Sequence, residues 1–166
     1  MKLSSNNAIL VKWGNEEMDC FICKKHRGEI KTDGIAIYED EFVCVGHIDN
    51  NGEPGYLGHL MIDLKRHAPT LGDMSEEEAK AFGSIMARVS KALMVTEGAE
   101  HIYSLVSGNA VPHLHMHIVP RYPGTPEQYW GPMSVRDWSD APIGGNQEII
   151  ALCERVRSYL EKNNEQ

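Results

Sequence analysis

Basic side chains are too few in this sequence for a protein whose main partner is a nucleic acid. Lysine and arginine number 16 against 24 aspartates and glutamates, which gives a formal net charge of -8. A protein that follows a phosphate backbone needs a basic surface, so we expect no nucleic-acid polymer as partner. A small anionic ligand needs only a few local donors, for which Lys65, Arg66 and Arg121 are candidates.

Long apolar runs are also missing. The longest one near the N-terminus, Ala8–Val11, is too short for the core of a secretory signal. No segment approaches the ~20 apolar residues of a transmembrane helix. We therefore expect a cytoplasmic protein without a membrane partner, whose four cysteines are reduced thiols.

Internal repeats and low-complexity segments are absent as well. A chain of 166 residues with 42% hydrophobic residues can build one hydrophobic core. We therefore predict a single domain over residues 1–166.

The order of apolar and turn residues predicts short strands with two amphipathic helices among them. The longer helix should begin at Ser75, where Glu78 completes a capping box, and end near Gly98. Strands outnumber long helices and most connections are short, which indicates an α+β protein with a largely antiparallel sheet. The other expected elements are a helical turn at 9–13, a hairpin of 34–38 and 42–45, strands at 58–62, 101–106 and 113–119 (stopping at Pro120), and a last helix over 147–161.

The most informative segment is His113–Val119, in which three histidines alternate with apolar residues. A β-strand turns successive side chains to opposite faces, so His113, His115 and His117 should share one face. Three explanations fit this pattern. The histidines bind a metal ion, or one of them is a nucleophile, or they are bonded to their surroundings without a chemical role.

Three segments resemble the histidine triad (HIT) nucleotide hydrolases and transferases. Val111–Arg121 is similar to the family motif His-φ-His-φ-His-φ-φ, in which φ is apolar and Pro-Arg often follows. Gly58–His67 resembles the family's Gly-His-x-apolar segment, and Cys20–Lys24 resembles the opening of its zinc-containing members. The resemblance covers a motif-bearing core of about residues 20–121 and leaves 122–166 as a C-terminal extension.

The resemblance implies a HIT-like fold with a mainly antiparallel five-stranded sheet, one long central helix and a C-terminal helix. It also implies a homodimer and a small-molecule nucleotide substrate, with adenine as the family's usual base. The substrate would be an AMP conjugate, such as a dinucleoside polyphosphate or a phosphoramidate.

The resemblance also implies roles for individual residues. His115 would attack the α-phosphorus and form a nucleotidyl-histidine intermediate, and His117 would donate a hydrogen bond to the phosphate or the leaving group. Asn109 is placed to bind a phosphate oxygen, although many relatives carry Gln or Ser in this stretch. His59 could complete the substrate site, or it could simply be a strand histidine bonded to the main chain.

Cys20 and Cys23 have the C-x2-C spacing of a zinc site. A thioredoxin-like motif would need a βαβ context, which the sequence does not show. The resemblance adds His67 and His113 as the two remaining ligands of a structural zinc ion. A CxxC motif without metal remains the alternative, since many relatives lack one or more ligands.

Three functions are therefore compared. The first is a HIT-type nucleotidyl hydrolase or transferase acting through His115. The second is a metal-dependent hydrolase with a catalytic ion on the histidine strand, and the third is a non-catalytic, zinc-stabilised nucleotide-binding protein.

The remaining candidates have simpler interpretations. Cys44 and Cys153 should be buried as small apolar residues. We expect the histidines without a motif to be exposed or locally bonded, and the tryptophans of the extension to pack rather than bind ligand; these residues are His26, His47, His101, Trp130 and Trp138.

Overall fold

The computed structural model describes residues 19–32, 34–48 and 50–163. The helical turn expected at 9–13 lies outside these residues. Within the described part, no helix has both the length and the apolar character that a membrane span requires.

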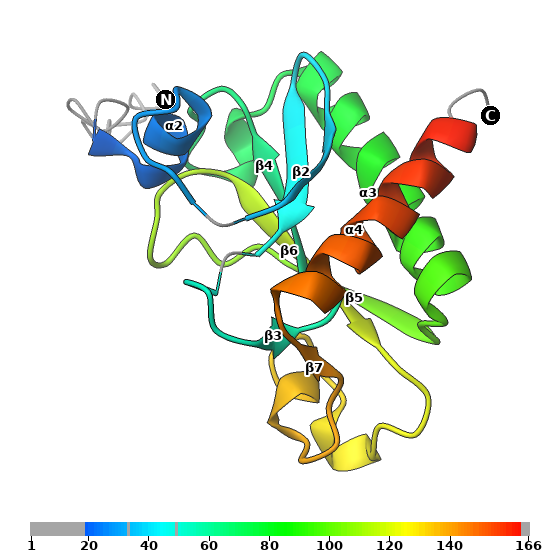
Figure 1. The fold of residues 1–166 in the computed structure, drawn as a ribbon. Helices are drawn as coiled ribbons and strands as arrows, with labels where there is room; N and C mark the ends of the chain where they lie inside the picture. Colours follow the sequence, from blue (N-terminus) through cyan, green and yellow to red (C-terminus); the bar gives the residue numbers. More distant parts are fainter. Residues whose placement is uncertain (1–18, 33, 49, 164–166) are drawn as a thin grey trace, which may run out of the picture.

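An antiparallel sheet of five strands forms the centre of the fold, in the order β1-β2-β4-β6-β5 (Figure 1). A small second sheet pairs β3 with β7. The strands are β1 Ala36–Glu39, β2 Val43–His47, β3 Gly55–Tyr56, β4 Leu60–Leu64, β5 His101–Leu105, β6 His115–Arg121 and β7 Ile143–Gly144.

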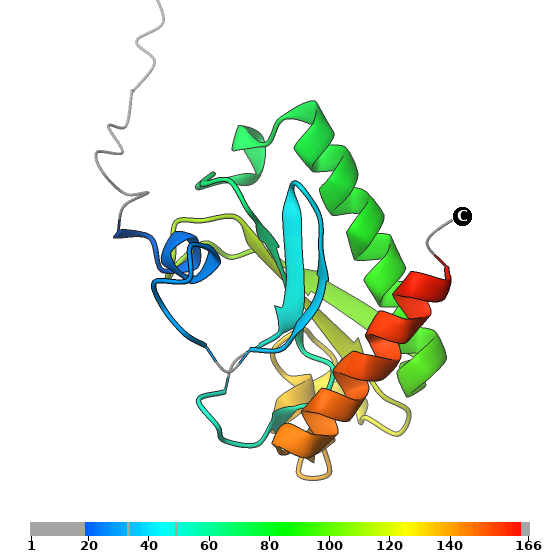
Figure 2. The same ribbon diagram turned by 45° about the horizontal axis from the view of Figure 1, so that its top comes forward.

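Helices lie on both sides of the large sheet. The long helix α3 (Glu76–Glu97) and the C-terminal helix α4 (Asn146–Lys162) cover one face, and the short helix α2 (Phe21–His26) lies on the other side (Figures 1 and 2). Three short 3-10 turns, η1 Leu71–Asp73, η2 Glu127–Tyr129 and η3 Val135–Asp137, lie in the connections. This arrangement confirms the predicted α+β, HIT-like architecture.

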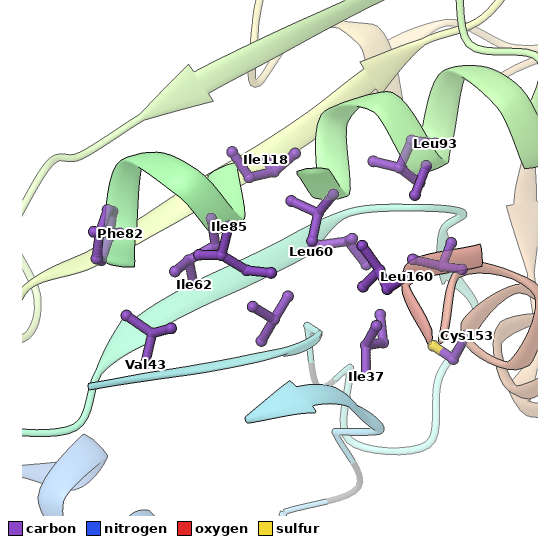
Figure 3. Packing of buried hydrophobic residues seen from close by; sticks show 14 of the residues in the cluster. Ile37, Val43, Leu60, Ile62, Phe82, Ile85, Leu93, Ile118, Cys153 and Leu160 are labelled. Carbon is purple, nitrogen blue, oxygen red and sulfur yellow. The ribbon is translucent and has the colours of Figure 1, made fainter. Parts of the chain in front are cut away.

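The hydrophobic core fills the space between the sheet and the two long helices (Figure 3). Ile85 and Leu93 of α3 and Leu152 of α4 are almost fully buried there. They meet apolar side chains from β1, β2, β4 and β6, such as Ile62 and Ile118. The core therefore occupies one face of the sheet and leaves the opposite face of β4 and β6 to other side chains.

Helix α3 has the ends that the sequence predicts. The Ser75 hydroxyl accepts a hydrogen bond from the Glu78 amide, and the Glu78 carboxylate accepts one from the Ser75 amide. Gly98 ends the helix in the left-handed conformation at φ 73°, which glycine adopts without strain.

Four strands, β1, β2, β4 and β6, begin one or two residues later than predicted. Gly58 lies in a tight turn with φ +82°, and a Cβ atom there would approach Tyr122 and Pro120 at 2.8 and 2.9 Å. The strand β4 therefore starts only at Leu60, after His59.

The histidine strand is also displaced from its predicted bounds. It starts at His115 and continues through Pro120 to Arg121, so the expectation that it stops at Pro120 is wrong. The pairing of β4 with β6 ends at Ile118, and the missing N–H of Pro120 therefore costs no hydrogen bond of that ladder.

Candidate active site and metal site

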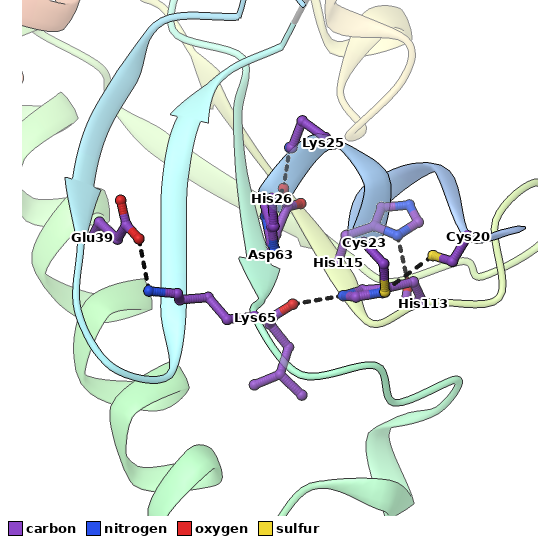
Figure 4. Close-up of polar contacts among 10 residues, drawn as sticks. Cys20, Cys23, Lys25, His26, Glu39, Asp63, Lys65, His113 and His115 are labelled. Carbon is purple, nitrogen blue, oxygen red and sulfur yellow. Dashed lines mark hydrogen bonds and ion pairs between the residues drawn. The ribbon is translucent and has the colours of Figure 1, made fainter. Parts of the chain in front are cut away.

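Four side chains from three distant segments form a cluster that could hold a metal ion. Cys20 caps α2 and Cys23 lies in its first turn, while His67 follows β4 and His113 precedes β6. Their ligand atoms all lie within 4.8 Å of one another. Both cysteines and His113 are at most 6% exposed (Figure 4).

The distances in this cluster fit zinc. Zn–S and Zn–N bonds of about 2.3 and 2.0–2.1 Å in a tetrahedron separate sulfur from nitrogen by about 3.6 Å. The observed distances from Sγ to Nδ1 are 3.4 Å for Cys20–His113 and Cys23–His113 and 3.5 Å for Cys23–His67. The four protein ligands fill all four positions, as in structural rather than catalytic zinc sites.

A hydrogen bond to the main chain gives His113 the tautomer that can bind a metal ion through Nδ1. Its Nε2 lies 2.6 Å from the carbonyl oxygen of Leu64. A carbonyl only accepts, so Nε2 carries the proton and Nδ1 turns its lone pair to the thiols. Metal-bound histidines typically donate their second N–H in this way.

Side chains on β6 alternate as the sequence predicts. Leu114, Met116 and Ile118 pack into the core under α3. The rings of His115 and His117 lie on the opposite face, with centroids 5.5 Å apart. The three histidines are thus divided, because His113 joins the cysteines and the other two remain next to each other.

His115 has the opposite tautomer from His113. Its Nδ1 lies 2.6 Å from the carbonyl oxygen of His113 and donates to it. The lone pair is therefore on Nε2, and only 8% of the residue is exposed. A neutral imidazole with a free Nε2 is chemically able to act as a nucleophile.

His59 and His117 are bonded to each other. The Nε2 of His59 lies 3.0 Å from the Nδ1 of His117. Burial, together with the charges of His117, His47 and Arg136, lowers the pKa of His59 to about 3. Burial and the charge of His115 also lower the pKa of His117, so both rings are neutral at pH 7.

Asn109 lies at the surface. It occupies an exposed position in the connection between β5 and β6, four residues before His113. The structure therefore brings together His59, His115 and His117 and leaves Asn109 at the surface.

A pocket of about 480 Å³ opens beside the histidines, between α2 and the sheet face of β1, β2 and β4. Met61 and Asp63 line it from β4. In the sheet these two residues lie directly opposite His117 and His115. The pocket therefore borders the histidine row along two cross-strand neighbours.

Asp63 supplies a buried negative charge at this border (Figure 4). It is 2% exposed and forms an ion pair with Lys25, and its Oδ2 lies 3.4 Å from the Nε2 of His26. Burial raises the pKa of Asp63, but the hydrogen bond from His26 and the charge of Lys25 outweigh it and keep the pKa below its ordinary value.

Several of these residues were not expected to contribute. Asp63 had a usable signal, because it is the charged residue of an otherwise apolar strand. His26 is not locally bonded, since its partner lies 37 residues away. Cys44, expected to be buried, is only half-buried and lines the pocket.

A HIT domain matches residues 28–124, more than half of the chain. The chain therefore belongs to the HIT domain family.

The similarity to two relatives extends beyond residues 28–124. Adenylylsulfatase HINT3 of Arabidopsis thaliana is 33% identical over 147 residues, 86% of this chain and 70% of that protein. Adenosine 5'-monophosphoramidase hnt1 of Schizosaccharomyces pombe is 27% identical over 150 residues, 87% of this chain and 100% of that protein. At the level of the family, these comparisons support a nucleotide hydrolase that acts on small nucleotide substrates.

Solved structures support the fold. A Zn-bound histidine triad family protein from Mycobacterium smegmatis superposes with a TM-score of 0.64 at 19% identity, over 89% of this chain and 97% of that one. Such a likeness at this identity supports the architecture only.

Proposed function

We propose that the protein cleaves a nucleoside 5'-phosphoryl conjugate, an AMP conjugate in the first instance, at its α-phosphate through His115. The observation that carries the proposal is the hydrogen bond from Nδ1 of His115 to the His113 carbonyl at 2.6 Å. It leaves a lone pair on Nε2, and Asp63, the cross-strand neighbour of His115, lines a pocket of about 480 Å³. This volume lies within the usual range of about 300–1,000 Å³ for small-molecule sites.

The reaction would take two displacements at phosphorus. The Nε2 lone pair of His115 forms a P–N bond as the bond to the leaving group breaks, and the leaving group departs with the electron pair. A water or another acceptor then forms a P–O bond and loses its proton, while the P–N electrons return to the imidazole. Covalent catalysis replaces one difficult displacement by two easier ones.

The neighbours of His115 would support this step. Directly opposite residues of an antiparallel pair have Cβ atoms about 4.5–5.5 Å apart, so Asp63 stands beside the positive charge that develops on the ring. His117 would donate from Nε2 to a phosphate or leaving-group oxygen. This requires His59 to donate its Nε2–H to Nδ1 of His117, which makes His59 a positioning residue.

We also propose that Asn109 binds a phosphate oxygen of the substrate. The loop that carries it leads directly into His113 and β6, so an amide donor there could reach a phosphate oxygen once substrate is bound. Loss of affinity for AMP in an Asn109→Ala variant would support this role, and an unchanged affinity would remove it.

We propose that zinc binds to Cys20, Cys23, His67 and His113 and serves the structure. His115 is outside this set, which speaks against the metal-dependent hydrolase. When bound, the ion would fix α2 and the segment leading into β6, while the chain's own histidines carry out the chemistry.

We also propose a homodimer and a cytoplasmic location. The strand β5 is an edge of the sheet, and an edge presents main-chain groups with which a second copy can pair. None of the four cysteines forms a disulfide, which suits a reducing compartment. Sedimentation should give a mass of about twice 18.6 kDa, and a monomer at all concentrations would contradict the homodimer. Recovery of the protein outside the cytosolic fraction would contradict the cytoplasmic location.

A trapping experiment tests the reaction. The protein is mixed with AMP amide, AMP-lysine or a dinucleoside polyphosphate, quenched, and analysed by intact mass spectrometry and peptide mapping. We expect an adenylyl adduct on His115, and its loss in His115→Ala with fold, zinc content and AMP binding retained. His101→Ala, which removes an exposed histidine of β5, is the matched control.

The alternatives give other results. Full turnover by His115→Ala would overturn the proposal. Binding of AMP by the wild type without turnover of any conjugate would favour the non-catalytic protein. An equal loss on changing each triad histidine, with immediate loss on chelation, would favour the metal-dependent hydrolase.

A further inference from the structure

The extension beyond residue 121 is attached to the same face of β6 that carries the two site histidines. Val119 follows His117 on this face and is buried against Val135 and Tyr56. The next residue on the face, Arg121, stacks its guanidinium 3.8 Å above the ring of Trp130. These contacts help to hold residues 122–145 beside the site.

Arg136 is placed by the first of these contacts. It directly follows Val135, which is 1% exposed and anchors η3 to β6, yet Arg136 itself is exposed. Throughout residues 19–32, 34–48 and 50–163, no carboxylate lies within ion-pair distance of its guanidinium. It is a cation without a counterion.

The charge of Arg136 acts on the far end of the histidine row. After burial, and beside the charges of neighbouring histidines, it contributes to the lowered pKa of both His59 and His117. The pocket runs beside the row on the β2 side, past Asp63 opposite His115 and Met61 opposite His117. A substrate with its nucleoside in the pocket and its α-phosphorus at His115 would extend its leaving group toward His117, His59 and Arg136.

We propose that Arg136 binds an anionic leaving group, a sulfate or phosphate joined to the α-phosphate, and so sets the preference for anhydrides over amides. This inference rests on the proposed function. When the P–O bond of an anhydride breaks, its electron pair adds negative charge to the departing sulfate or phosphate, and a guanidinium matches such an oxyanion with two parallel N–H donors. A departing amine gains no such charge and needs a proton instead.

The test compares leaving groups on one nucleotide. Adenosine 5'-phosphosulfate and a dinucleoside polyphosphate are the anionic arms, and AMP amide is the neutral arm. We expect Arg136→Met to lower kcat/KM on both anionic substrates by about 10- to 100-fold, the value of one hydrogen bond to a charged group. Turnover of the amide should change by less than about threefold, and Arg136→Lys should restore part of the loss.

Controls separate a local effect from a general one. Lys91→Met removes one exposed positive charge on α3, across the sheet from the site, and should leave all three substrates unaffected. Inorganic sulfate and pyrophosphate should inhibit the wild type more strongly than Arg136→Met. If only one of the two anionic substrates responds, that substrate identifies the leaving group.

Two outcomes overturn the inference while the proposed function stands: an equal loss on anhydrides and amide, or no loss on either anhydride. If the wild type turns over no substrate, the proposed function fails instead. In that case pyrophosphate is titrated into the wild type and into Arg136→Met, and the NMR shifts of the His59 and His117 rings are followed. Equal shifts in the two proteins would show that Arg136 does not bind the anion and would refute the inference.

Discussion

At the scale of single residues, two main-chain carbonyl groups decide what His113 and His115 can do. The Leu64 carbonyl takes the Nε2 proton of His113, and the His113 carbonyl takes the Nδ1 proton of His115. One ring therefore offers Nδ1 to the thiols and the other offers Nε2 to a substrate. Two histidines spaced by one residue are suited to different chemistry by main-chain acceptors, one outside the motif (Leu64) and one within it (His113).

These tautomers mark where prediction from sequence ends. The two-residue period of His113–Val119 predicts which side chains share a face, because strand geometry alone fixes it. The proton positions depend on a carbonyl 49 residues away in one case. The pairing of His26 with Asp63 likewise depends on tertiary packing, and no spacing rule connects the two residues.

The buried histidine pair predicts a pH effect on stability. The pKa of His59 is about 3 in the fold and about 6.5 in the unfolded chain. Between these values the unfolded chain binds a proton that the folded protein does not, so the free energy of unfolding falls as the pH falls below about 6.5. Above that pH both forms are neutral, and this group causes no further change.

Replacement of His59 by asparagine should make this fall shallower, by up to about 1.4 kcal/mol for each pH unit. Urea denaturation of both proteins at several pH values between 7 and 5 measures it. Acid release of a metal ion affects both proteins alike and cancels in the difference. If the free energy of unfolding falls equally with pH in the wild type and in the variant, His59 takes up protons in the fold as readily as in the unfolded chain.

At the scale of elements, α2 cannot be stable by itself. It has six residues, far fewer than the ~12–15 at which isolated helices become marginally stable. Its contacts with the rest of the protein include the two thiols at the His113 ring and the ion pair of Lys25 with Asp63. Because Lys25 and His26 line the pocket, the position of α2 also shapes the proposed nucleoside site.

Zinc removal should therefore loosen α2 and lower the stability of the protein. We expect one zinc ion per chain by elemental analysis, and a lower Tm after chelation or in Cys23→Ser. Cys44→Ser changes a half-buried thiol outside the cluster and should keep the metal and the Tm. Protein that carries no zinc and whose Tm does not respond to added zinc would contradict the proposal.

The elements themselves could be predicted to different degrees. The ends of α3 follow from local signals, and its predicted bounds are confirmed. Ser75 and Glu78 form the capping box within its first turn, and Gly98 ends its last turn. The start of β6 could not be predicted, because a hydrogen bond from Leu114 to the Ala68 carbonyl directs the chain before His115. The partners of a strand, and so its ends, come from distant segments.

At the scale of the whole molecule, the main hydrophobic core and the candidate site lie on opposite faces of the large sheet. One face carries α3, α4 and the main core, while the other carries the histidines, the pocket and the cysteine cluster. The extension beyond the matched HIT domain contributes to both sides. Residues 122–145 pack against Val119, two residues after His117 on β6, and α4 adds Leu152 and Val156 to the core under the sheet.

We therefore propose that the chain unfolds as one domain, with α4 as an integral part, and two adjacent residues of α4 test this. Ile149 is 5% exposed in the core, whereas Ile150 is 43% exposed. Ile149→Ala should lower the free energy of unfolding by about 2–5 kcal/mol, because it removes buried methyl groups and leaves a cavity. The same change at Ile150 should alter the free energy of unfolding by no more than about 0.5 kcal/mol.

Urea unfolding followed by tryptophan fluorescence and by circular dichroism should give one coincident transition in both variants, shifted only for Ile149→Ala. A separate early transition for α4, with the rest of the curve unchanged, would show that the extension is an independent unit packed on a HIT domain that is stable without it.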